Sequence, residues 1–383
     1  MSTATGSEIA TTLYTRTGGW RDPLPDLDSE RTLVLAFAGS GYFDDHARWD
    51  ELTRMYRNSH LLGCSTAGEI LGPRLHDDSI VLAVMRFRHT RLKTVWAPVR
   101  SSGASRDSGR ALARQLDEPG LRGVLVLSDG LHVNGTELVG GLNETLPPGV
   151  IVTGGLAGDS ASFERTWALR DGRPESRVVT AVGLYGDRVR IGHGSKGGWD
   201  VFGPERRVTR SEGNVLFELD GKPALALYKN YLGERAADLP ASALLFPLAL
   251  RSGPSDEKRL VRTVLSVDED AQSMTFAGDV PEGHLAQLMR ANFDRLIEGA
   301  ADSAMMTRAT HGEGSGLAIA ISCVGRRLVL GERASEELER TLDVLSEGTQ
   351  QVGFYSYGEL SPYASGACDL HNQTMTLTTI EEA

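Results

Sequence analysis

Three stretches of the chain share an arrangement of residues that could bind a polar ligand. In each, a short apolar strand runs into a glycine that is followed directly by an acid. The stretches are LLGCSTAGEI, IVTGGLAGDS and GFYSYGELSP, and their acids are Glu69, Asp159 and Glu359. A carboxylate at a strand end can hold a ligand ammonium, while neighbouring backbone N–H groups hold a carboxylate. The alternative is that each acid accepts hydrogen bonds within its own turn.

The residues around the three acids supply the predicted ligand contacts. The C-terminal stretch is the richest in polar and aromatic side chains, so its residues are the strongest candidates. We expect the three turns to line one shared ligand site. The predicted ligand-binding residues are Cys64, Ser65, Thr66, Gly68, Glu69, Gly155, Gly158, Asp159, Tyr355, Tyr357, Gly358, Glu359, His371 and Asn372.

The first turn contains residues that could support two other chemistries. GCSTAGE has the glycine spacing of a phosphate-binding loop, but an acid stands where that loop needs lysine, which argues against nucleoside triphosphate binding. Cys64 would serve a hydrolase or transferase only if a base or a lowered pKa activated its thiol. His60 lies four residues back along the strand, about 13 Å away at ~3.3 Å per residue. A buried inert cysteine is the favoured interpretation, and we expect no catalytic step.

The histidines show no H-x-x-x-H or H-E-x-x-H pair, so no metal site is predicted. His193 lies in the glycine-rich GHGSKGGW, where the backbone could approach a ligand closely, and His371 lies in LHNQTMT. Either could ligate a haem iron or bond a polar ligand, and the alternative for each is a structural histidine. We expect no cofactor, with haem as the alternative.

Each glycine–acid turn belongs to a repeated pattern of elements. An apolar strand, a helical segment and a second strand precede the turn, and an alternating strand follows it. A strand–helix–strand segment gives a parallel pair, and the returning strand gives an antiparallel neighbour. The pattern predicts an α/β fold with mixed sheets covered by helices. The predicted first strands are 33–40, 124–130 and 316–325, the helices 44–57, 136–146 and 335–345, and the last strands 79–87, 177–186 and 372–380.

The length of 383 residues suggests two domains, at ~100 to 200 residues per domain. We predict a lead-in over 1–30, an N-terminal domain over 31–205 and a C-terminal domain over 206–383. A short helix is predicted at Glu8 to Tyr14, and one long helix within 281–309, beginning after Gly283.

Composition narrows the class of partner. The 51 acids and 40 bases give a formal charge of −11, and no Lys/Arg cluster forms a basic patch, so nucleic acid is not an expected partner. Three scattered cysteines predict no disulfide framework and favour a reducing cytoplasm. The N-terminus has neither a basic start nor an apolar core, and no run approaches ~18 apolar residues. We therefore expect no membrane insertion and no export.

The motifs GCSTAGEI, GGLAGDS, VTRSEGNVLFELDGKPALALYKNYLG and GFYSYGELSP with LHNQTMTLTTI resemble the paired N- and C-terminal FIST domains. The name refers to F-box and intracellular signal transduction proteins. The resemblance runs from about Arg31 to Ile380, and the last motif is its most specific part. It implies mixed α/β sheets and a sensory module that binds small ligands such as amino acids. It also implies an alternative, because a subset with a similar domain plan binds haem and senses nitric oxide.

Family members are often joined to kinase, cyclase or chemotaxis output domains. In this chain the FIST-like sequence ends a few residues before Ala383, so we expect the signal to pass to a separate partner. The sequence therefore predicts a cytoplasmic small-ligand sensor in intracellular signal transduction, binding amino acids or similar small polar metabolites. The alternatives are a haem-binding nitric-oxide sensor and an enzyme that uses Cys64 as nucleophile.

Overall fold

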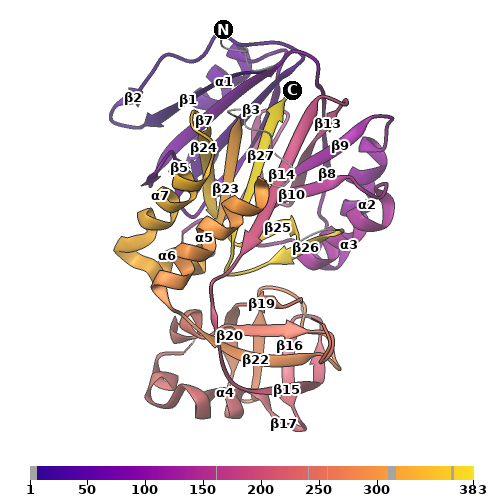
Figure 1. The fold of residues 1–383 in the computed structure, drawn as a ribbon, viewed down its shortest axis with the longest axis vertical. Helices are drawn as coiled ribbons and strands as arrows, with labels where there is room; N and C mark the ends of the chain where they lie inside the picture. The colour runs from indigo at the N-terminus through magenta and orange to yellow at the C-terminus, as the bar shows by residue number, and fades with distance from the viewer. Residues whose placement is uncertain (1–6, 161, 240, 257, 309–315, 364–365) are drawn as a thin grey trace.

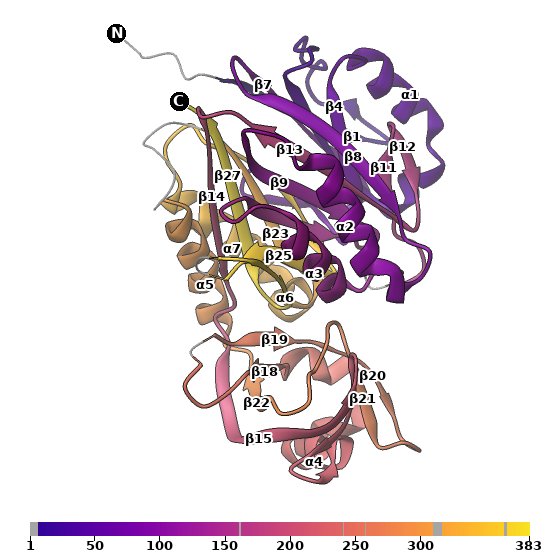
Figure 2. The ribbon, with the colours of Figure 1, turned by 90° about the vertical axis from the view of Figure 1, so that its right-hand side faces the viewer.

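The computed structural model describes residues 7–383 except 161, 240, 257, 309–315 and 364–365. It is a mixed α/β structure, which confirms the predicted fold class. Most of the chain forms one body of sheets covered by helices, and residues 200–290 form a smaller lobe beside it (Figures 1 and 2). No helix among the described residues has the length and apolar character needed to cross a bilayer.

The body is built from three sheets, which we call sheets 1, 2 and 3. Sheet 1 has the order β12 (Arg173–Glu175), β11 (Ala168–Arg170), β4 (His60–Thr66), β3 (Thr32–Gly39), β7 (Ser79–Phe87), β1 (Ser7–Thr15) and β2 (Gly19–Trp20). Sheet 2 has the order β26 (Cys368–His371), β25 (Gly358–Pro362), β10 (Ile151–Leu156), β9 (Leu121–Ser128), β13 (Val178–Tyr185) and β8 (Arg91–Pro98). Sheet 3 has the order β14 (Val189–Lys196), β27 (Met375–Glu382), β23 (Leu317–Cys323), β24 (Gln350–Ser356), β5 (Glu69–Leu71) and β6 (Arg74–His76).

The three sheets have the same central arrangement. Strands β3 and β4, β9 and β10, and β23 and β24 form parallel pairs. The strand that closes each segment, β7, β13 or β27, runs antiparallel to the first strand of the pair. A further antiparallel strand, β1, β8 or β14, then pairs with the closing strand.

A hairpin follows each glycine–acid turn, beginning at the glycine or the acid itself in the first and third segments and after a loop in the second, and joins the sheet of another segment. The hairpin β5–β6 pairs with β24 of sheet 3, β11–β12 pairs with β4 of sheet 1, and β25–β26 pairs with β10 of sheet 2. Each hairpin therefore covers a strand edge that would otherwise have unpaired backbone groups. This exchange ties the three sheets together around the turns.

The first strands read as continuous apolar runs because both of their faces are buried. In β3, Leu33, Leu35 and Phe37 face a core shared by all three sheets, whereas Val34 and Ala36 face the helix side of sheet 1. The same alternation in β9 and β23 sends one set of residues to the shared core and the other toward the helices. The helices thus cover the outer faces while the sheets meet in the middle.

The helices of the body are α1 (His46–Met55), α2 (Ser105–Leu116), α3 (Gly135–Thr145), α5 (Phe293–Thr307), α6 (Val324–Leu330) and α7 (Ala334–Val344). Helices α1, α3 and α7 correspond to the predicted helices at 44–57, 136–146 and 335–345. Helix α1 packs on sheet 1 through Trp49 and Leu52. Helices α2 and α3 lie together on sheet 2, and α5 and α7 on sheet 3 (Figure 1).

The smaller lobe is a separate sheet inserted between β14 and α5, and we call it the inserted sheet. The predicted boundary after residue 205 falls inside its first strand, β15. Helix α4 (Ala224–Leu232) packs on the core of this lobe through Leu225 and Tyr228. The strand order is β19 (Leu260–Arg262), β18 (Leu248–Arg251), β22 (Leu285–Arg290), β15 (Asp200–Glu212), β16 (Val215–Leu219), β21 (Ser273–Phe276) and β20 (Val264–Asp268), with β17 (Lys222–Pro223) beside β16.

Two helix predictions were wrong, because the spacing of apolar residues in these segments fits a strand as well as a helix. The predicted helix at Glu8 to Tyr14 is strand β1, whose apolar Ile9 and Leu13 pack on the shared core with a spacing that fits either structure. The predicted long helix after Gly283 begins as strand β22, and α5 starts only after Asn292, whose side chain accepts a hydrogen bond from the Arg295 N–H. Residues 1–6 of the lead-in and residue 309 lie outside the described residues.

Candidate functional site

The three glycine–acid turns lie next to one another in the middle of the body. The Ala67 N–H donates to the Tyr355 carbonyl at 2.8 Å, and the Gly158 N–H donates to the Ser65 carbonyl at 3.0 Å. A third bond runs from the Tyr357 N–H to the Leu156 carbonyl at 3.1 Å. Each turn is thus bonded to a neighbour through the backbone.

The carboxylates of Glu69 and Glu359 are fully buried and have matching partners. Glu69 accepts from the Thr66 hydroxyl and from the N–H and hydroxyl of Ser79, at 3.0 and 2.7 Å. Glu359 accepts from the Ser356 hydroxyl at 2.7 Å and from the N–H and hydroxyl of Thr374, at 3.2 and 2.8 Å. In both cases the acid ties its turn to the start of the closing strand.

Asp159 uses its carboxylate differently, although it is also buried. It accepts from the backbone N–H groups of Phe163, Glu164 and Arg165, at 2.9, 2.7 and 2.7 Å. The Tyr357 hydroxyl also donates to it. These bonds hold the loop that leads to β11. Each acid thus accepts hydrogen bonds from its own turn or the loop after it, as in the alternative interpretation. Glu69 and Glu359 also accept from the residues that begin the closing strands, and Asp159 accepts from Tyr357 of another turn.

Burial changes the acidity of two of these groups. Removal from water raises the pKa of Glu69 to about 7 and that of Glu359 to about 8, and the hydroxyl and N–H donors only partly oppose this effect. Both pKa values lie within reach of neutral pH. The two side chains can therefore gain or lose a proton under ordinary conditions.

The remaining predicted residues of the turns are also buried. Burial raises the pKa of the Cys64 thiol well above its usual value, so the geometry gives no support to a nucleophile there. The Ser65 hydroxyl accepts from the Trp167 N–H at 3.1 Å. Gly155 has no room for a side chain, because an added Cβ would lie 2.9 Å from Ile321. Gly358 is crowded in the same way by the side chains of β26 and β10.

Tyr355 belongs to a buried ion-pair network that the sequence did not reveal. Its hydroxyl donates to Glu337 at 2.7 Å, and Glu337 also accepts from the Ser322 hydroxyl at 2.9 Å and pairs with Arg326 at 2.6 Å. The side chains of Arg326 and Glu337 are both fully buried. Arg326 further donates to the Gly197 carbonyl, so this network holds the loop that follows β14.

That loop forms one wall of a cavity of about 150 Å³ between the body and the inserted sheet, which we call the seam cavity. The other walls come from the inserted sheet, from α5 and from the segment around β26. The lining residues are Ser195, Lys196, Gly197, Gly198, Trp199, Arg259, Val261, Met289, Met306, Tyr363, His371 and Thr374.

Of the predicted ligand residues, His371 lines the seam cavity, and Asn372 follows it in the chain. The His371 ring bonds the Ser361 carbonyl through Nε2 at 3.0 Å, so Nε2 carries the proton and Nδ1 is left as an acceptor. Burial lowers the pKa of His371 to about 4, which keeps the ring neutral at neutral pH. Asn372 is fully buried, and neither atom of its side-chain amide has a partner among the described residues.

Glu359 stands directly behind this cavity. Thr374 donates to Glu359 and also lines the cavity, so one residue separates the carboxylate from the space. Among the three turns, the structure places the C-terminal turn nearest the cavity.

Two cationic side chains line the seam cavity. Lys196 and Arg259 are exposed, and neither pairs with a carboxylate in the part of the chain that the structure describes. The indole of Trp199 donates to the Gln373 carbonyl at 2.8 Å, which fixes an aromatic wall beside the two cations. No acid is among the lining residues of this cavity, as far as the described chain goes. The arrangement can hold a carboxylate against the cations and a planar or apolar part against the aromatic side chains.

Sequence reasoning missed most of these residues. Arg259 and Met289 come from the inserted sheet and have no motif that links them to the C-terminal turn. The stretch GHGSKGGW was the available signal, because it contains Lys196 and Trp199. Part of its glycine content serves helix packing instead, since a Cβ on Gly194 would lie 2.0 Å from the Ser303 carbonyl oxygen of α5.

A haem fits this site poorly. The seam cavity is about 150 Å³, whereas pockets for drug-sized ligands span roughly 300–1,000 Å³. His193 lies on β14, half-buried, and is not among the cavity-lining residues. In the described ranges, no group of three or more His, Cys, Asp or Glu side chains is placed to hold a metal ion.

The chain combines mixed α/β sheets with a cavity at the edge of an inserted sheet, and comparison with known proteins gives its family. Residues 32–222 match the FIST N domain and residues 224–362 match the FIST C domain. Together the two matches cover most of the chain, which therefore belongs to the FIST family. FIST domains are associated with signal transduction and small-ligand sensing.

A curated relative is similar over a shorter stretch. It is an uncharacterized protein of Methanocaldococcus jannaschii, 26% identical over 166 residues. The match covers 39% of this chain and 31% of the relative. The chain thus spans about a third of the length of that relative.

Proposed function

We propose that the protein is a small-ligand sensor that binds an amino acid, or a similar small polar metabolite with a carboxylate, in the seam cavity. The observation that carries this proposal is that two cations, Lys196 and Arg259, line a cavity with no acid in its lining. Neither cation pairs with a carboxylate of the described residues. A cavity of about 150 Å³ suits a ligand of a few heavy atoms. The family association with small-ligand sensing points the same way.

The opposite wall suits the other end of an amino acid. Neutral His371 can accept a hydrogen bond at Nδ1, and the Trp199 and Tyr363 rings can contact an ammonium or a side chain. The buried amides of Asn372 and Gln373 lack partners among the described residues, although buried polar groups are normally bonded. Their unused hydrogen bonds favour a polar ligand near this segment.

Ligand binding in the seam cavity would change the relative position of the body and the inserted sheet. A ligand that touches both Arg259 of the inserted sheet and His371 of the body favours one relative position of the two parts, and only such differential contact shifts a conformational equilibrium. We propose that a separate output protein recognises that position. Three buried cysteines, Cys64, Cys323 and Cys368, are free thiols, which supports the proposal of a reducing cytoplasm.

The test is calorimetric titration of the full chain with each of the twenty amino acids. We expect amino acids of one chemical class to bind and to raise the Tm of the protein, because a ligand that binds only the folded state stabilises it. Arg259→Ala and Lys196→Ala should each weaken binding about tenfold, the loss expected for one charge-assisted hydrogen bond.

Arg100→Ala is the matched control, because Arg100 is an exposed arginine without an ion pair among the described residues and lies outside the cavity lining. It should leave affinity unchanged. Binding that survives both cavity substitutions, or a complete lack of amino acid binding by a folded protein, would overturn the proposal.

A further inference from the structure

A second cavity of about 350 Å³ lies on the other face of β19, beside the start of α3, and we call it the α3 cavity. Successive residues of an extended strand point to opposite faces. Arg259 and Val261 therefore line the seam cavity, whereas Lys258, Leu260 and Arg262 line the α3 cavity. The other lining residues of the α3 cavity are Thr136, Leu250, Arg251, Ser252, Asp256, Asp279, Pro281 and His284.

Arg262 is the distinctive group of this cavity, with only 3% of its surface exposed. Its Nε donates to the Asp279 carbonyl at 3.0 Å, and its Nη1 donates to the Val261 and Leu370 carbonyls at 3.2 Å. It forms no ion pair with a carboxylate of the described residues. Burial lowers the pKa of Arg262 to about 10, so the guanidinium stays charged at neutral pH. A buried cation without an anionic partner is costly.

The other cations of the cavity already have partners. Arg251 pairs with Glu205, and Lys258 pairs with Asp369. Even so, the Nε atom of Arg251 is buried without a hydrogen-bond partner among the described residues. The same holds for the hydroxyl of Thr136. Residues that line the cavity thus keep unused donors.

The two acids of the lining are engaged by the protein. Asp256 accepts from the Ser252 hydroxyl at 2.6 Å and from the Lys258 N–H at 2.9 Å. Asp279 accepts from the Asn134 amide at 3.1 Å and also raises the pKa of Arg262 by its charge, without an ion pair to it. Neither acid therefore neutralises Arg262 by direct contact.

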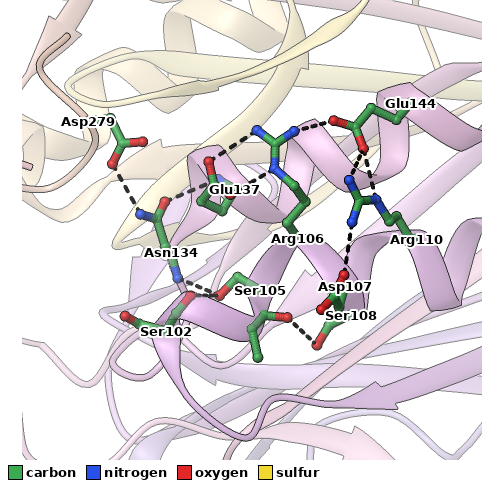
Figure 3. A network of polar contacts seen from close by, with 11 residues as sticks. Ser102, Ser105, Arg106, Asp107, Ser108, Arg110, Asn134, Glu137, Glu144 and Asp279 are labelled. Carbon is green, nitrogen blue, oxygen red and sulfur yellow. Dashed lines mark hydrogen bonds and ion pairs between the residues drawn. The ribbon is translucent and has the colours of Figure 1, made fainter. Parts of the chain in front are cut away.

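The start of α3 beside the cavity is held by a network of hydrogen bonds and ion pairs. Asn134 caps α3, donates to Asp279 of the inserted sheet and accepts from the Glu137 N–H, and its own N–H donates to Ser105 (Figure 3). Arg106 of α2 pairs with Glu137 and Glu144 of α3 in the same network (Figure 3). The first turn of α3, which carries Thr136, is therefore fixed beside the cavity.

We propose that the α3 cavity binds a small oxyanion, a carboxylate or a phosphate, and that Arg262 is its main contact. Nη2 of Arg262, which makes no hydrogen bond to the described residues, supplies one donor. The Thr136 hydroxyl and the Arg251 Nε supply further donors after small side-chain rotations. This site is distinct from the seam cavity and does not depend on the function proposed there.

The experiment is calorimetric titration of the full chain with succinate and, separately, with inorganic phosphate. We expect at least one of them to bind, and the stronger one identifies the chemical source of the oxyanion. Arg262→Met should weaken that binding at least tenfold. Because it also removes three hydrogen bonds from Arg262 to carbonyls, a thermal melt must show that the variant is folded. Arg262→Lys retains the positive charge, so its affinity for the oxyanion should lie between that of the wild type and that of Arg262→Met. Arg100→Ala, at an exposed arginine outside the lining of both cavities, should leave the oxyanion affinity unchanged.

A second pair of variants keeps the test decisive if Arg262→Met does not fold. Thr136→Val should weaken oxyanion binding about fivefold, whereas Thr349→Val should not, although Thr349 also has a buried hydroxyl without a partner among the described residues. The proposal is overturned if wild-type protein binds neither anion, or if binding is unchanged in the folded Arg262 and Thr136 variants. Arg262 would then be only a tie between β19 and the Leu370 carbonyl.

Discussion

The middle of the body and its boundary with the inserted sheet use polar residues in opposite ways. Around the three turns, Glu69, Asp159 and Glu359 are buried, and each accepts at least three hydrogen bonds from the protein. At the boundary, Lys196, Arg259 and Arg262 have no carboxylate partner among the described residues. Satisfied polar groups hold a structure together, whereas unsatisfied ones remain available to a ligand. The turns therefore stabilise the fold, and the proposed ligand sites both lie at the boundary.

Glu337→Ala should give the largest effect on stability. The substitution leaves buried Arg326 without its partner and removes the acceptor of Tyr355 and Ser322, which should cost about 3–5 kcal/mol of unfolding free energy. Urea denaturation measures it. Glu339→Ala on the same helix is the control, because Glu339 is exposed and should change stability by less than about 0.5 kcal/mol. A similar loss of unfolding free energy in Glu337→Ala and Glu339→Ala would contradict the view that buried, partnered polar groups stabilise the body.

The second-largest effect concerns the buried Glu359 in the middle of the body, which should make the stability of the protein depend on pH. The pKa of Glu359 is raised to about 8 in the folded state, so its stabilising contribution is fully present below about pH 4.5 and is lost as the pH rises through 8. Between pH 6 and 9 we expect a loss on the order of 2 kcal/mol from this group. Glu359→Gln mimics the protonated acid and should remove that part of the slope.

The measurement is the difference in unfolding free energy between wild type and Glu359→Gln at each pH, which cancels the other titrating groups. Glu69, with a pKa raised to about 7, should continue to lower the stability of both proteins over the same range. Parallel curves for the two proteins would show that Glu359 is already ionised in the folded state.

Arg259→Ala should give the smallest effect on stability, less than about 0.5 kcal/mol, because the side chain is exposed and makes no ion pair among the described residues. Its predicted effect lies in ligand affinity instead. Thermal melts without ligand and calorimetry with ligand separate the two quantities. A large loss of stability in this variant would mean that the boundary residues are structural, as those of the turns are.

Local structure followed closely from the sequence. The strand at Ser79–Phe87 ends where predicted, and α3 and α7 lie within one residue of the predicted bounds 136–146 and 335–345, because alternation and turn residues act over short distances. The errors occurred where a pattern fits two structures, as in β1, whose Ile9 and Leu13 suit a helix or a strand. The continuous pairing of β1 with β7 decided that case.

The sequence by itself determined the α/β class, the three similar segments and the family, since these depend on patterns along the chain. It also placed an acid after a glycine three times, but it did not tell which acids would find partners. Only the tertiary structure decided that the hairpins exchange between sheets and that Arg259 and His371 meet at one cavity. Side chains alternate between the two faces of a strand, so the sequence shows which residues share a face. Which element covers that face depends on contacts between distant parts of the chain.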